Sequence, residues 1–103
     1  MKTLRPLLTL AQLQAADVHV EAFKALAHLT RLRVFFFVVR SKGEVAVGEI
    51  QEALGVPAPT LSHHLDILRR AGLLKRRRQE RHIYYSVRRE MVTDLVRLLT
   101  ACC

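Results

Sequence analysis

Apolar side chains recur at helical spacing over most of the chain, which predicts a mainly α-helical protein. The pattern is weak over residues 4–16 and clearer over residues 17–27, where it predicts a helix with an apolar face. This spacing is carried by Leu7, Leu10 and Leu13, then by Val20, Phe23, Lys24 and Ala27, with Ala25 and Leu26 widening the face. The next helix is predicted to begin at Thr30, whose hydroxyl can cap it, and to end at Arg40. Because it is apolar on nearly every side, we expect it to be the central core helix.

Two short helices with a tight turn between them are predicted over residues 47–71. The first spans residues 47–54, the turn spans residues 55–57, and the second begins at Pro59 and stops before Gly72. Two helices joined by a short turn that contains glycine are typical of a helix-turn-helix. In the second helix we expect an inward face of Leu61, Leu65 and Leu68, and a largely outward face of Thr60, Ser62, His63, Asp66, Arg69 and Arg70.

The start of that second helix has no capping side chain. With Pro59 as the first helical residue, the cap position falls on Ala58, which has no side-chain oxygen for the free N-terminal amides. Those amides are then available to a phosphate. A helix end capped by water is the equally weighted alternative.

Residues 73–87 combine β-prone ends with a strongly basic middle, which predicts a two-stranded hairpin. Directly after a helix-turn-helix, such a hairpin forms a wing whose arginines can reach phosphates or a minor groove. Tyr84 and Tyr85 alternate across the strand, so we expect one in the core and the other near a sugar-phosphate backbone.

A last helix is predicted over residues 88–101, with an apolar stripe wider than one thin core needs. We therefore expect a dimer contact on this helix, formed by Met91, Leu95, Leu98 and Leu99.

Composition and charge add a partner to this picture. The 103 residues form one small domain, 1–103, and half of them are apolar, so we expect part of that apolar surface to be covered in a homodimer. The net charge is +8 at pH 7, and residues 69–89 hold nine basic side chains and a single acidic one, Glu80. A solvated basic face usually mixes glutamates with its arginines. The segment is therefore typical of a surface that binds a polyanion.

The N-terminal run "MKTLRPLLTLAQLQAADV" has a basic start like a secretory signal, but its apolar part is short and interrupted by Gln12 and Gln14. No run reaches membrane-spanning length, so we expect no membrane partner. Two cysteines without a signal peptide favour the cytoplasm, where thiols stay reduced.

Three segments, "ALAHLTRLRV" (25–34), "APTLSHHLDILRRAGLL" (58–74) and "RRRQERHIYYSV" (76–87), resemble in order and spacing the ArsR-type repressors of arsenical and metal resistance. The resemblance implies a winged helix-turn-helix of about five helices plus a two-stranded β-hairpin wing, and a homodimer joined by the first and last helices. It implies binding to palindromic operator DNA until an inducer lowers the affinity. We expect DNA contacts from Thr60, Ser62, His63, His64, Arg69, Arg76, Arg77, Arg78 and Arg81.

The chain also departs from that family. Many members have paired cysteines before the turn, where Ala46 and Gly48 stand here, so that metal site is absent. Others bind zinc between their last helices, but no histidine follows His82. The wing tip usually has glycine where this chain has Glu80, which leaves the geometry of the turn open.

Cys102 and Cys103 resemble the cysteines with which one subgroup senses trivalent arsenicals at the end of the last helix. Arsenic(III) forms three bonds and favours thiolate sulfur, so two thiols leave one valence. Methylarsenite would fit the pair completely, whereas arsenite or antimonite would be bound less completely. We expect no required cofactor and a trivalent arsenical as inducer.

Several alternatives stay open for these residues. The cysteines could form a redox-sensitive bond or simply bury two small side chains, while zinc would need four ligands. A thiol enzyme is disfavoured because a helix C-terminus disfavours a thiolate, so we expect no enzyme. Adjacent His63 and His64 do not share a helix face and should serve binding or packing rather than metal. A small basic structural RNA-binding protein is the alternative from another class.

Overall fold

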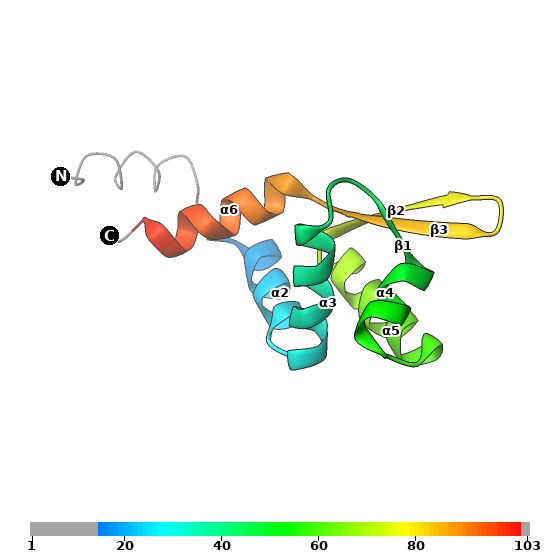
Figure 1. Ribbon diagram of the computed structural model, residues 1–103. Helices are drawn as coiled ribbons and strands as arrows, with labels where there is room; N and C mark the ends of the chain where they lie inside the picture. The colour runs from blue at the N-terminus through cyan, green and yellow to red at the C-terminus, as the bar shows by residue number, and fades with distance from the viewer. Residues whose placement is uncertain (1–14, 102–103) are drawn as a thin grey trace.

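The computed structural model describes residues 15–101. Its helices and strands are α2 (Asp17–Leu26), α3 (Leu29–Arg40), β1 (Val45–Ala46), α4 (Val47–Leu54), α5 (Ala58–Arg70), β2 (Leu74–Gln79), β3 (His82–Val87) and α6 (Arg89–Thr100) (Figure 1). The fold is mainly helical with a β-hairpin wing, as predicted. The first helix expected within residues 4–16 and the pair Cys102 and Cys103 lie outside, or almost wholly outside, the described residues.

The sheet has three strands in the order β1-β3-β2, one more than the predicted hairpin. In the hairpin, Leu74 pairs with Val87 and Gln79 pairs with His82, so two residues form the turn. The additional strand, β1, is only two residues long and pairs antiparallel with β3. A strand of this length has no sequence period of its own, which is why the pattern of apolar positions did not predict it.

The predicted starts of α3 and α5 need correction. α3 begins at Leu29 with His28 as its N-cap, so Thr30 lies inside the first turn and does not cap the helix. α5 begins at Ala58 with Pro57 as its N-cap, one residue before the predicted start. No side chain caps α5, so its first amides lack an intramolecular side-chain partner, as expected.

The core lies between α3, α5 and the sheet. α5 buries Leu61, Leu65 and Leu68, as the sequence predicted. α3 is central, but it buries only one face, formed by Val34, Phe35 and Val38, and exposes Leu29, Leu32, Phe36 and Val39. The inward face of α2 is only partly the one predicted: Ala25 is buried and Phe23 and Leu26 pack against the core as expected, but His19 and Ala22 are also buried and Val20 is exposed.

His19 joins α2 to α6 from a buried position. The backbone N–H of Ala16 donates to its Nδ1 at 3.0 Å, which leaves Nε2 facing Asp94 of α6 at 3.8 Å from Oδ2. The two helices therefore share a polar contact in addition to apolar packing. Within residues 15–101, no helix combines the length and apolar character needed to cross a membrane.

The wing turns at Glu80, the single non-glycine residue with positive φ in the described chain, at 57°. An L side chain in this conformation costs energy that glycine does not. Glu80→Gly should therefore raise the free energy of unfolding by about 1 kcal/mol in a urea titration. Arg81→Gly, in the same turn but without a positive φ, should lower it instead, and equal effects of the two substitutions would contradict this explanation of the turn.

Candidate nucleic-acid interface

A cleft of about 470 Å³ lies between the second helix of the helix-turn-helix and the wing. Its walls come from β1, the start of α4, the middle of α5 and both strands of the hairpin. The lining residues are Ala46, Val47, Gly48, Ser62, Leu65, Asp66, Arg76, Arg81, His82, Ile83 and Tyr85. The cleft thus places side chains that can donate hydrogen bonds, from segments far apart in the sequence, around one open channel.

The α5 side of the cleft is formed by Ser62, Leu65 and Asp66, while Thr60 and His63 lie elsewhere on the exposed part of the same helix. Thr60, Ser62 and His63 are all exposed, as predicted for residues that contact DNA. Because no side chain caps α5, its N-terminal amides add a partial positive charge at the same end of the helix. The contacts of these three residues with DNA remain predictions.

The wing side of the cleft presents guanidinium groups. Arg76 and Arg81 are exposed, and no carboxylate in residues 15–101 forms an ion pair with either of them. Arg78 is also exposed, and its Nε donates to the backbone oxygen of Glu80 at 3.3 Å. These groups can donate to phosphate oxygens without first breaking an internal ion pair.

Asp66 forms ion pairs with two arginines of α5. Its carboxylate accepts from Arg69 at 2.6 Å and from Arg70 at 2.8 Å. The hydrogen bond from Arg69 lowers the pKa of Asp66, so the carboxylate is charged at neutral pH. Arg69 was predicted to contact DNA, but it is partly buried and already paired within its own helix. It is therefore a weaker candidate than the wing arginines.

Arg77, another predicted DNA contact, is held by neighbouring side chains. Its Nε and Nη2 donate to Glu44 at 2.7 and 2.8 Å, Nη1 donates to Gln79 at 2.9 Å, and its guanidinium lies 4.8 Å from the centre of the Tyr84 ring. The hydrogen bond from Arg77 lowers the pKa of Glu44. Side chains alternate along a strand, so Arg77 and its partner Tyr84 lie on the opposite face of the sheet from Arg76 and Tyr85. Arg77 fixes the wing to the segment before β1 instead of lining the cleft.

This difference predicts distinct salt dependences for two single substitutions. Arg81→Ala should lower the slope of log affinity against log salt by about one unit, because one phosphate contact is lost. Arg77→Ala should leave that slope unchanged, although it can weaken binding by loosening the wing. Fluorescence anisotropy with a labelled duplex at several salt concentrations measures both slopes. If Arg77→Ala lowers the slope as much as Arg81→Ala, Arg77 contacts phosphate after all.

The predicted position of His64 needs correction. It was predicted near base edges or phosphates, but it is 7% exposed and faces α3, where its ring centre lies 4.8 Å from that of His28. The adjacent His63, about 100° further around the helix, is exposed. The two neighbouring histidines therefore have different surroundings, and packing is the role of His64. Tyr85 similarly belongs to the core, at 4% exposed, while Tyr84 packs under Arg77.

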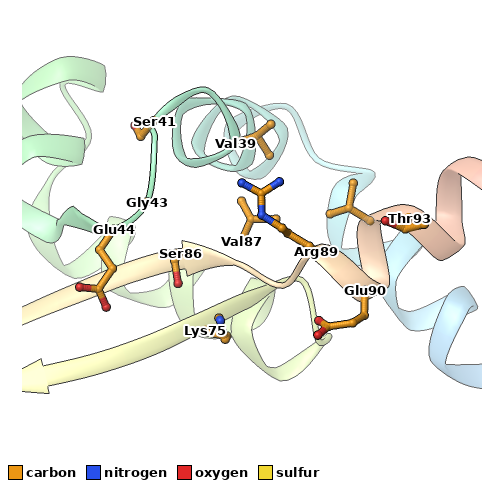
Figure 2. A pocket seen from close by; sticks show the side chains of 11 residues that line it. Val39, Ser41, Gly43, Glu44, Lys75, Ser86, Val87, Arg89, Glu90 and Thr93 are labelled. Atoms are coloured by element: carbon orange, nitrogen blue, oxygen red, sulfur yellow. The ribbon is translucent and has the colours of Figure 1, made fainter.

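A second cavity, of about 460 Å³, lies where α3, the sheet and the start of α6 meet. Figure 2 shows Arg89 reaching from the beginning of α6 toward Val39 of α3, above Val87 of the sheet. Because three elements enclose it, a movement of α6 relative to the wing would change its shape. This cavity marks the joint between the last helix and the wing.

The predicted dimer residues on α6 divide into two groups. The first group is exposed and consists of Leu99, at 64% exposed; Val96, one turn earlier on α6, is also exposed, at 53%. Leu95 is 5% exposed and packs inside the subunit, so it supports the helix but does not present a surface. Met91 also packs against the core, next to Gly72. Leu98 is partly buried.

Comparison with known proteins agrees with this geometry. A family model described as a helix-turn-helix domain matches residues 26–77, about half of the chain. The HTH-type transcriptional regulator KmtR of Mycobacterium tuberculosis is 40% identical over 75% of this chain and 58% of its own length. The arsenic resistance transcriptional regulator ArsR1 of Pseudomonas putida is 41% identical over 67% of this chain and 53% of its own length. The chain thus spans little more than half of each of these relatives.

A solved structure from Mycobacterium bovis is similar in three dimensions. It is described as the homodimeric winged helix-turn-helix DNA-binding domain of a possible ArsR-family transcriptional regulator. The TM-score is 0.69 with 28% identity, over 84% of this chain and 79% of that one.

Proposed function

Because the chain belongs to the ArsR family of winged helix-turn-helix transcriptional regulators, we propose that it is a dimeric repressor that binds a palindromic operator. As a DNA-binding regulator it is not an enzyme. The observation that supports operator binding most strongly is the cleft between α5 and the wing, where Ser62, Arg76 and Arg81 converge. In a symmetric pair, two such clefts would meet successive major grooves roughly 34 Å apart.

The dimer contact is proposed on the exposed apolar side chains of α6 and α3. These side chains are Val96 and Leu99 on α6, and Leu29, Leu32, Phe36 and Val39 on α3. Val39 and Val92, the latter on α6, line the same cavity. Apolar patches of this kind are commonly covered in oligomers. The homodimeric state of the similar Mycobacterium bovis structure supports a dimer.

We propose that the inducer is a trivalent arsenical bound by the thiols of Cys102 and Cys103, with methylarsenite fitting better than arsenite or antimonite. The relative named for arsenic resistance supports this class of ligand. An inducer must favour one of two dimer geometries over the other, since equal affinity for both shifts nothing. Binding just beyond α6 would reorder that helix, which begins at the cavity beside the wing.

Selection of bound duplexes from a random-sequence library tests the proposed operator. The expected outcome is enrichment of two inverted half-sites whose centres lie about 10 base pairs apart, with two chains bound per duplex. Failure to enrich any duplex sequence, or a motif without inverted symmetry bound by a single chain, would contradict a symmetric repressor.

A further inference from the structure

His64 is the buried histidine of the recognition helix, α5, and no group in the proposed DNA contact uses it. Only two buried side-chain polar atoms in residues 15–101 lack a hydrogen-bond partner, Nδ1 of His64 and Nε of Arg69. Arg69 is held by Asp66 through another nitrogen. The His64 ring has no such second anchor in the described residues, and it lies at the contact between α5 and the start of α3.

The surroundings of His64 disfavour a positive charge. His28, the N-cap of α3, lies 4.8 Å away between ring centres, and His63 lies 5.8 Å away. Arg31 of α3 is also close enough to act electrostatically. α2, the third element at this junction, brings Glu21 and Lys24, which pair with each other at 3.6 Å. Burial lowers the pKa of His64, and the charges of His28, Arg31 and His63 lower it further.

We propose that His64 is a positioning residue for DNA recognition. Its neutral imidazole packs α5 against α3 through His28, and its protonation loosens this packing and weakens DNA binding. The effect on DNA binding rests on the proposed function, but the effect on the packing of α5 against α3 does not. A metal site here is not the better explanation, because residues 15–101 contain no group of three or more His, Cys, Asp or Glu side chains that could hold a metal ion.

The sign of the pH dependence follows from the two states of the chain. In the unfolded chain His64 has an ordinary pKa near 6.5, and in the folded chain its pKa is lower. Below about pH 6.5 the unfolded state therefore binds more protons, so acidification destabilises the fold.

The test compares His64→Gln with His63→Gln, a matched substitution at the next position of the same helix. From about pH 7.5 to about pH 5.5, the unfolding equilibrium constant of the wild type should rise by up to about tenfold more than that of His64→Gln. His63→Gln removes the smallest of the named influences on His64, so its profile should lie much closer to that of the wild type than to that of His64→Gln. A third variant, His28→Asp, places a carboxylate beside the ring, and acidification should then stabilise the fold relative to the wild type.

DNA affinity is measured for the same variants over the same pH range. Relative to His64→Gln, the wild type should lose affinity on acidification by up to about tenfold. Parallel unfolding profiles of the wild type and His64→Gln would overturn the proposal whether or not the chain binds DNA. Divergent unfolding profiles with identical affinity profiles would overturn its DNA part. Absence of DNA binding in all variants at every pH would instead refute the proposed function.

Discussion

Replacing Arg76 and Arg81 together with alanine is expected to weaken binding to every duplex by roughly 100-fold at physiological salt. Both guanidinium groups line the cleft and neither has an ion-pair partner among the described residues. Each can therefore donate to phosphate without breaking an ion pair, and the loss of one charge-assisted contact weakens binding by roughly tenfold. Because phosphate contacts are the same for all sequences, the loss should be nearly uniform across operator and unrelated DNA.

The matched control removes two arginines from outside the cleft. Arg33 and Arg40 lie on α3 beside Phe36 and Leu54, and they line a different surface cavity. Arg33→Ala with Arg40→Ala changes the net charge of the protein by the same amount, so it should reduce affinity only through the long-range field. If the two double variants lose affinity equally, the cleft has no special part in DNA binding.

Cys102→Ser is expected to abolish release by arsenicals while operator affinity stays that of the wild type. A hydroxyl keeps nearly the size of the thiol but does not bind arsenic(III) in its place. In the wild type, methylarsenite should lower operator affinity by about 10- to 100-fold, the usual range for allosteric coupling. Anisotropy titrations of the preformed complex with methylarsenite, arsenite, antimonite and zinc measure this directly.

A parallel titration with peroxide separates the arsenical proposal from a redox switch. Release by peroxide that a reducing thiol reverses, with no response to methylarsenite, would support a redox-sensitive repressor. Release by methylarsenite in Cys102→Ser would exclude the cysteine pair from the mechanism.

Much of the fold could be predicted because its helices obey simple periodicity. Leu61, Leu65 and Leu68 recur on one face of α5, and all three are buried. The exact bounds depended on backbone geometry. In α5, for example, the N-cap position is occupied by Pro57 and not, as expected, by Ala58. β1 was missed because its two residues are held by pairing with β3, a contact distant in sequence.

The candidate site was predicted in composition but not in detail. A run of arginines indicates a polyanion surface, yet the run itself does not reveal that Glu44, 33 residues earlier, holds Arg77. The strand alternation could have separated Arg77 from Arg76, had the register with Tyr84 been known. Likewise, the inward spacing of Leu61, Leu65 and Leu68 places position 64 next to the buried face, which is the signal that His64 is packed.

The most direct test of DNA recognition is a competition experiment on the complex of the protein with its selected duplex. A scrambled duplex and an RNA of the same sequence compete against the labelled operator at fixed salt. Recognition by α5 and the wing predicts that the scrambled duplex requires a concentration at least about 1,000-fold higher than unlabelled operator, and that the RNA competes no better. Equal competition by operator and scrambled DNA, or stronger competition by RNA, would contradict a sequence-reading repressor.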